Sequence, residues 1–256
     1  MNKIKLNDIE FSNQSPLVFI AGPCAIESSE HAVRMAHLLK DMSIENNFQL
    51  IFKCSFDKAN RTSVKSERGV GLKKSIAIFE KIKLETKLPI LTDVHETYQC
   101  DEIKDCVDII QIPAFLARQT DLLIAAAKTN KVVNIKKSQF MSPWEAKYPI
   151  EKIESQSNKK IILTERGYTF GYNNLVVDFR SIEVMKKFDY PVVFDATHSV
   201  QLPGGGNNKS SGQKEFIDSL STAAVSLGIS GIFAEVHDNP NIAISDSENQ
   251  LDLEAF

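Results

Sequence analysis

The chain has 256 residues, a formal net charge of -3 and 43% hydrophobic residues. This composition is close to the average of globular proteins and excludes disordered, fibrous and collagen-like classes. It also lacks the basic excess of nucleic-acid-binding proteins. The four cysteines have no C-x-x-C spacing, so they indicate neither a disulfide scaffold nor a zinc ribbon. The sequence shows no signal segment, and its longest early apolar run is far shorter than a membrane span of roughly 20 residues. We therefore expect a cytoplasmic protein.

Eight short runs rich in Val, Ile and Phe recur along the chain, with mixed apolar and charged stretches between them. The runs cover 17–23, 49–55, 89–94, 107–114, 131–137, 160–166, 191–197 and 231–236. Short and nearly continuous apolar runs are typical of strands that are buried on both faces of a parallel sheet. Between them, helical spacing of apolar residues is evident at 31–45, 73–85, 121–130 and 213–228.

Eight strands that alternate with helices over about 250 residues predict an α/β fold, namely a single (β/α)8 TIM barrel. No G-x-G-x-x-G follows the first strand, which argues against a dinucleotide-binding sheet. We expect residues 1–256 to form one domain, with 1–13 as a short N-terminal β-hairpin that closes one end of the barrel. The segments 167–178 and 199–212 are rich in Gly and Asn and are expected to be long loops, the second of them mobile over the site.

Nearly every predicted strand ends in a polar or reactive residue. In chain order these residues are Cys24, Lys53 with Ser55, Asp93, Gln111, Lys136, Arg166, His198 and Glu235. In a (β/α)8 barrel such ends meet at one face, where the active sites of this fold lie. Packing alone does not explain so many polar ends, because buried charges are costly unless they are paired.

One group of these residues has the chemistry of metal ligands. Cys24, His198 and Glu235 follow the first, seventh and eighth strands, which barrel closure makes neighbours, and Asp246 in the next loop could reach the same place. Sulfur, imidazole and carboxylate ligands together suit zinc, iron or manganese. His237 is a rival ligand farther along the loop. The alternative is that Cys24 is a small buried hydrophobe and His198 an ordinary hydrogen-bonded residue.

The second group is cationic and indicates an anionic ligand, because Arg pairs with phosphate or carboxylate and Lys adds a point charge. Its members are Lys53, Lys136 and Arg166 at strand ends, Lys58 and Arg61 in the next segment, and Arg118 after the fourth strand. The alternative is a set of solvated surface cations, which suits Lys58 best.

With these two groups of residues, the chain resembles the family of 3-deoxy-D-manno-octulosonate 8-phosphate (KDO 8-phosphate) synthases. The likeness covers nearly the whole chain after the hairpin and includes IAGPCAIES (20–28), FKCSFDKANRTS (52–63), QIPAFLARQTDLL (111–123) and FDATHSVQLPGG (194–205). It implies a transferase that condenses phosphoenolpyruvate with D-arabinose 5-phosphate and water, giving KDO 8-phosphate and inorganic phosphate for lipopolysaccharide precursors. The alternatives are a related synthase that uses another aldose phosphate, such as erythrose 4-phosphate, and a non-catalytic phosphosugar-binding or metal-storage barrel.

The resemblance also implies a role for each candidate residue. Phosphoenolpyruvate would contact Lys53, Ser55, Lys58, Gln111, Ala114, Lys136 and Arg166, and arabinose 5-phosphate would contact Asn60, Arg61 and Thr62, where the family usually has Ser. The expected catalytic residues are Cys24, Lys58, Asp93 and His198, and the expected ligands of a divalent metal are Cys24, His198, Glu235 and Asp246. Cys24 indicates the metal-dependent subclass, since an Asn replaces this Cys in metal-independent members. Arg118 would reach the sugar phosphate in a neighbouring subunit's site, which implies a homo-oligomer, by family expectation a homotetramer.

Overall fold

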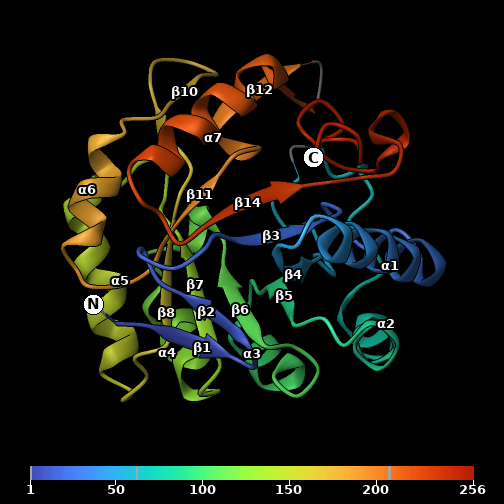
Figure 1. Ribbon diagram of the computed structural model, residues 1–256, viewed down its shortest axis with the longest axis horizontal. Coiled ribbons are helices and arrows are strands. Elements are labelled where there is room, and N and C mark those ends of the chain that lie inside the picture. Colours follow the sequence, from blue (N-terminus) through green and yellow to red (C-terminus); the bar gives the residue numbers. More distant parts are fainter. Residues whose placement is uncertain (1, 62, 207–208) are drawn as a thin grey trace.

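The computed structural model describes residues 2–61, 63–206 and 209–256, in which eight parallel strands close into a barrel with helices outside it (Figure 1). The strands are β3 (Val18–Gly22), β4 (Gln49–Lys53), β5 (Ile90–Asp93), β6 (Ile109–Ile112), β7 (Val132–Lys136), β8 (Ile161–Glu165), β11 (Val192–Asp195) and β14 (Gly231–Glu235). Each lies within one of the predicted runs. The last barrel strand, β14, pairs with both β11 and β3 and closes the barrel, so the predicted fold is confirmed.

The helices cover the outer face of the barrel (Figure 1). They are α1 (Ser29–Glu45), α2 (Leu72–Thr86), α3 (Thr97–Ile103), α4 (Thr120–Lys128), α5 (Lys147–Glu154), α6 (Arg180–Lys186) and α7 (Ile217–Ser226). Short 3-10 helices add η1 (Ala114–Leu116), η2 (Pro143–Ala146), η3 (His198–Val200), η4 (Lys214–Phe216) and η5 (Pro240–Ile242). Among the described helices, none is both long and apolar enough to cross a membrane.

Alternation along the strands separates two apolar cores. Val18, Ile20 and Ile51 belong to the core inside the barrel, whereas the intervening residues belong to the larger core between strands and helices. Inside the barrel, the side chains change from apolar to polar toward the carboxyl ends of the strands. On four strands a polar residue comes two residues after an inner apolar side chain: Lys53 after Ile51, Asp93 after Leu91, Asp195 after Val193 and Glu235 after Phe233. The polar site is therefore built on the same rows that build the inner core.

The N-terminal hairpin is present and closes the amino end of the barrel. β1 (Ile4–Leu6) pairs antiparallel with β2 (Ile9–Phe11). Ile4 and Phe11 are buried in the inner core together with the amino-terminal residues of the barrel strands. The hairpin thus fills the end of the barrel opposite the polar rows.

The expectation of two long loops is wrong, because both segments contain short hairpins. In the first, β9 (Tyr168–Thr169) pairs with β10 (Leu175–Val176); in the second, β12 (Gln201–Gly206) pairs with β13 (Lys209–Gly212). Gly171 and Asn173 adopt positive φ angles of 75° and 52°, which a tight turn requires and which these residue types tolerate. The β9–β10 hairpin cannot be told from a loop by its sequence, because its two-residue strands are too short to show a period and its composition is that of a turn.

Candidate active site

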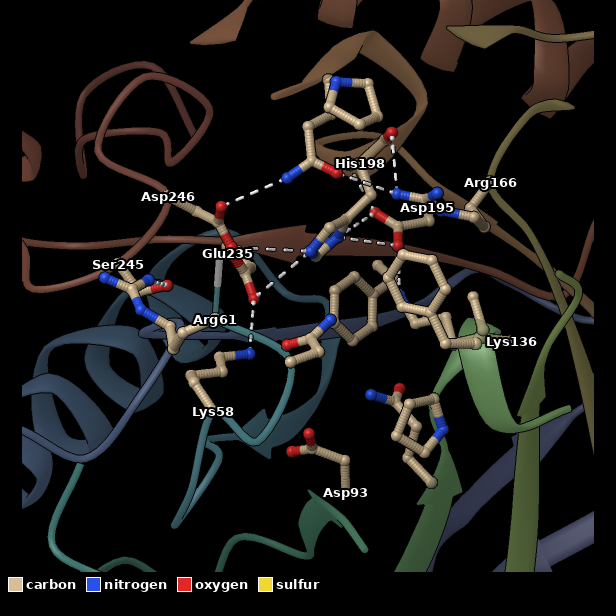
Figure 2. A pocket seen from close by; sticks show the side chains of 18 of the residues that line it. Lys58, Arg61, Asp93, Lys136, Arg166, Asp195, His198, Glu235, Ser245 and Asp246 are labelled. Atoms are coloured by element: carbon tan, nitrogen blue, oxygen red, sulfur yellow. Dashed lines mark hydrogen bonds and ion pairs between the residues drawn. The ribbon is translucent and has the colours of Figure 1, made fainter. Parts of the chain in front are cut away.

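The carboxyl ends of the barrel strands open into a cavity of about 460 Å³ (Figure 2). Its lining includes many of the predicted site residues, namely Lys53, Lys58, Asn60, Arg61, Asp93, Gln111, Ala114, Lys136, Arg166, His198, Glu235 and Asp246. Close approach of β3 and β4 helps to place Lys53, because a Cβ at Gly22 would lie only 2.1 Å from the Lys53 carbonyl oxygen. Glycine is therefore required at this position of β3.

One side of the cavity holds buried cations. The ammonium of Lys136 pairs with the carboxylate of Asp195 and lies 3.2 Å from the centre of the Phe233 ring. Burial lowers the pKa of Lys136 to about 8. Arg166 donates from Nη2 to Gln201 Oε1 over 3.1 Å. These cations are held in place before any ligand arrives, which favours binding of a doubly charged anion.

Two lysines surround the carboxylate of Glu235. The Nζ atoms of Lys53 and Lys58 lie 2.6 Å and 3.7 Å from Glu235 Oε1. Burial alone would raise the pKa of Glu235, but Lys53 and His198 outweigh burial and hold this pKa well below its usual range. Burial alone would lower the pKa of Lys58, but Cys24 and Glu235 outweigh it and raise this pKa well above normal. Both groups are therefore charged at neutral pH.

The predicted metal ligands come together at one edge of the cavity. Ligand atoms of Cys24, Glu235 and Asp246 all lie within 4.8 Å of one another. His198 Nε2 is 3.7 Å from Glu235 Oε1 and 4.0 Å from Asp246 Oδ2 (Figure 2). The other ring nitrogen, Nδ1, lies 2.9 Å from a carboxylate oxygen of Asp195. Donation from Nδ1 to Asp195 leaves the lone pair of Nε2 free on the side of the three other ligands.

The chemistry of this donor set fits a divalent transition metal. Glu235 Oε2 is buried and has no hydrogen-bond partner among the described residues. Burial, together with Glu235, raises the pKa of the Cys24 thiol well above its usual value, and Sγ lies 3.2 Å from Asp246 Oδ2, to which it donates. A dication would supply the partner that Glu235 lacks and would favour the Cys24 thiolate.

Another part of the cavity is lined by Arg61, Ser245 and Asp93. Arg61 donates to Ser245 Oγ over 2.6 Å and to the Ile244 carbonyl oxygen over 2.8 Å. Asp93 Oδ1 is buried without a hydrogen-bond partner in the described part of the chain, although His95 Nε2 lies 3.2 Å from its other oxygen. A polyhydroxylated ligand offers donors for such an oxygen. Thr62, predicted to contact the same ligand, lies outside the described residues.

Three predicted residues lie outside the cavity lining. Cys24 is buried, and its thiol contacts Asp246, which lines the cavity. Ser55 is fully buried, and its hydroxyl has no partner within the described ranges. The side chain of Arg118 is 61% exposed, with Nη1 4.0 Å from Glu145 Oε1. Within a single chain, Arg118 therefore does not belong to the site.

The sequence reasoning missed Asp195, Gln201, Ser245 and His95. Asp195 has a clear signal, because it follows Val193 by two residues and thus continues an inner row of the barrel. Gln201 and Ser245 have none, since they come from segments without a regular period. His95 follows Asp93 by two residues, just past the end of β5.

These features define a class of protein, namely a (β/α)8 barrel whose carboxyl face carries a cavity lined by buried cations, beside a group of Cys, Glu and Asp side chains that could hold a metal ion. Residues 2–256 match the sequence model of the DAHP synthetase I family, and the chain belongs to this family. It is 50% identical over 253 residues to the 2-dehydro-3-deoxyphosphooctonate aldolase of Brucella anthropi, covering 99% of this chain and 91% of the relative. The proteins of the same name from Brucella ovis and Brucella melitensis biotype 2 are each 49% identical over 251 residues, covering 98% of this chain and 91% of the relative.

Proposed function

We propose that this protein condenses phosphoenolpyruvate with D-arabinose 5-phosphate and water to give KDO 8-phosphate and inorganic phosphate. The observation that carries the proposal is one cavity with cations on two sides and a metal-ligand set between them. The relatives' names agree with it, because 2-dehydro-3-deoxyphosphooctonate is the same eight-carbon product. A cytoplasmic location, where phosphoenolpyruvate is made, belongs to the same proposal.

Phosphoenolpyruvate would bind on the side of Lys53, Lys136 and Arg166. It carries a phosphate and a carboxylate, and the buried cations offer a partner for each. Gln111 is fixed by the Asn134 amide, which donates to its Oε1 over 2.9 Å. The Gln111 amide nitrogen is thus turned away from Asn134 and available as a donor to the bound anion.

Arabinose 5-phosphate would bind on the side of Arg61 and Asp93. Arg61 and Asn60 line the cavity where the sugar phosphate fits, and Asp93 would accept a hydrogen bond from a sugar hydroxyl near the aldehyde. The charged Lys58, 3.7 Å from Glu235, would stabilise negative charge that develops on the aldehyde oxygen.

The reaction forms one C–C bond and breaks one C–O bond. C3 of phosphoenolpyruvate attacks the aldehyde carbon, forming a C–C bond, while the aldehyde oxygen takes up a proton and becomes a hydroxyl. Water adds at C2 and loses a proton, which gives a hemiketal phosphate. This intermediate collapses by C–O cleavage, so that inorganic phosphate leaves and the 2-keto group forms. Held between Lys53, Lys136 and Arg166, the phosphate would leave as a stabilised anion.

Cys24, His198, Glu235 and Asp246 would hold a divalent metal in this proposal. When bound, the metal would act as a Lewis acid toward the sugar aldehyde. Because thiolate, imidazole and carboxylate ligands tolerate several metals, zinc, iron and manganese are all candidates.

A homotetramer, in which Arg118 reaches a neighbouring subunit's cavity, completes the proposal. The Arg118 side chain is exposed and does not line the cavity of its own chain. Nearby aromatic side chains are exposed as well, at 54% for Phe115, 65% for Trp144 and 45% for Tyr148. Exposed apolar groups of this size on neighbouring segments are typical of a subunit contact.

The test is release of phosphate from phosphoenolpyruvate by the purified protein, measured with arabinose 5-phosphate and with erythrose 4-phosphate, alongside elemental analysis. We expect turnover with the five-carbon sugar, one transition-metal ion per chain, and loss of activity in chelator that added metal reverses. Turnover only with erythrose 4-phosphate would overturn the proposed acceptor. Full activity in chelator would overturn the metal dependence, and no phosphate release with either sugar would overturn the reaction.

A further inference from the structure

Glu27 lies outside the cavity lining and joins the two segments that carry Cys24 and Asp246. It belongs to the segment after β3 that carries Cys24, and it is not among the described residues that line the cavity. Its Oε1 accepts the backbone N–H of Ile244 over 3.0 Å and lies 3.2 Å from His237 Nε2. Both partners belong to the segment after β14. One carboxylate oxygen therefore links the first and last loops of the barrel.

The hydrogen bonds of the His237 ring define its contact with Glu27. His237 Nδ1 accepts the backbone N–H of Asn239 over 2.9 Å, so the proton of the neutral ring is on Nε2. This nitrogen donates to Glu27. Glu27, His31 and His237 have ligand atoms within 4.8 Å of one another, but a metal on Nε2 would force the ring proton onto Nδ1, which already accepts the N–H of Asn239. The cluster is therefore a hydrogen-bonded connection rather than a second metal centre.

The connection reaches the sugar-phosphate side through Ile244. The N–H of Ile244 donates to Glu27, while its carbonyl oxygen accepts from Arg61 Nη2 over 2.8 Å. The next residue, Ser245, accepts from Arg61 Nη1 over 2.6 Å. The backbone at Ile244 is thus held from both sides, and it in turn orients the guanidinium of Arg61.

The same connection reaches the metal side through Asp246. Asp246 has a φ of 49°, a left-handed conformation that costs free energy in a residue with a side chain. Asp is one of the few residue types that visit this region, and the backbone that leads into it is held at Ile244, two residues earlier. The carboxylate of Asp246 then lies next to the Cys24 thiol.

We propose that Glu27 is a positioning residue which fixes the segment 237–246 so that Arg61 and Asp246 keep their places at the sugar phosphate and at the metal. The inference rests on the proposed function, because that function assigns Arg61 to the sugar phosphate and Asp246 to the metal. It predicts that replacing Glu27, which lies outside the cavity, weakens binding of the metal and of the sugar phosphate together. Binding of phosphoenolpyruvate should stay intact.

The experiment compares Glu27→Ala, Glu27→Gln and, as a matched control, Glu30→Ala. Glu30 is an exposed carboxylate three residues away in the first turn of α1. The metal-free proteins are titrated with Co²⁺, and binding is followed by the thiolate-to-cobalt absorption of Cys24, which needs no turnover. The KM values for both substrates are then measured with the loaded enzymes, and circular dichroism and Tm report folding.

For Glu27→Ala we expect the Kd for Co²⁺ to rise about 10-fold or more, as for removal of other residues that orient metal ligands. We expect the KM for arabinose 5-phosphate to rise about tenfold through Arg61, and the KM for phosphoenolpyruvate to stay within about twofold. Glu27→Gln keeps an oxygen that accepts both N–H groups, so it should recover most of the loss, and Glu30→Ala should match the parent protein.

Unchanged Co²⁺ affinity and unchanged KM values in a folded Glu27→Ala would overturn the proposal. A parent protein that binds two Co²⁺ per chain, with Glu27→Gln binding one, would instead make Glu27 a metal ligand and overturn it as well. If Glu27→Ala does not fold, Glu27→Asp replaces it, because its shorter side chain cannot reach both partners and should lower Co²⁺ affinity similarly. If the parent protein releases no phosphate, the proposed function fails while the Co²⁺ titration still decides the role of Glu27.

Discussion

Lys136 is a buried ammonium whose charge depends on pH within the physiological range. It lies against the Phe233 ring and the Asp195 carboxylate at the end of β7. Burial lowers its pKa to about 8, below the usual value for lysine. The charged form is therefore present below this pH and is lost as the pH rises through it, whereas a bound anion favours the charged form.

Binding of phosphoenolpyruvate should weaken above pH 8 for this reason. We expect kcat/KM for phosphoenolpyruvate to fall toward about tenfold per pH unit on the alkaline side, because the free enzyme loses the Lys136 proton. Initial rates between about pH 6.5 and 9.5 measure it, and Lys136→Arg, which stays charged, should flatten the profile. A parent profile that is level up to about pH 9.5 would contradict the assignment.

Cys24 should determine metal retention. Replacement by Asn removes the sulfur ligand while keeping a polar side chain of similar size, so we expect metal affinity to fall about 100-fold or more. Elemental analysis after dialysis against a weak chelator measures the loss. Cys100→Ala is the matched control, because Cys100 is equally buried but lies in α3, away from the cavity. Equal metal content in both variants would rule out Cys24 as a ligand.

At the level of single residues, the sequence predicts what the barrel strands carry and little else. Lys53, Asp93 and Glu235 could be found because each directly ends a run of buried residues. Gln201 and Ile244 could not, since their roles depend on a backbone path that no period describes. Glu27 illustrates the same limit, because its partners lie more than 200 residues away in the chain.

Among the elements, the barrel strands were predictable and the short hairpins at its carboxyl face were not. A strand buried on both faces is apolar at nearly every position, and that signal stays visible in sequence. The pair β9–β10 has two residues in each strand and shows no alternation. Its formation depends on turn geometry and on packing against the barrel, which composition alone does not reveal.

The N-terminal hairpin should contribute stability without contributing to the site. Phe11 is fully buried at the amino end of the barrel, so Phe11→Ala should lower the free energy of unfolding by about 3–5 kcal/mol. Denaturation with urea measures this loss. The KM values of the folded variant should match the parent, since the cavity lies at the opposite end of the barrel. Altered KM values with unchanged stability would contradict this role.

On the scale of the whole molecule, the proposed tetramer makes Arg118 a part of another subunit's site. Arg118→Ala should raise the KM for arabinose 5-phosphate about tenfold while leaving the KM for phosphoenolpyruvate unchanged, because a lost charged contact costs roughly 1.5–3 kcal/mol. Light scattering should report four chains before and after the change. A fully active monomer would contradict the role of Arg118.

We also propose that residues 1–256 form one domain. Pairing of β14 with β3 makes both ends of the barrel sequence depend on each other. We therefore expect a single unfolding transition in urea, with fluorescence and circular dichroism giving the same midpoint. Two separate transitions would contradict a single domain.

The pairing of Cys24 with Asp246 has a consequence for how the protein matures, since 222 positions separate them in the chain. A ribosome releases the first residue of this pair long before the second, and barrel domains of this size fold as units. In the nascent chain, Cys24 thus has no contact with Asp246 until β14 has inserted beside β3. A metal held by this group would therefore be acquired late, by completed molecules. The identity of that metal would then reflect the pool available to finished protein, rather than the ion that first meets an emerging cysteine.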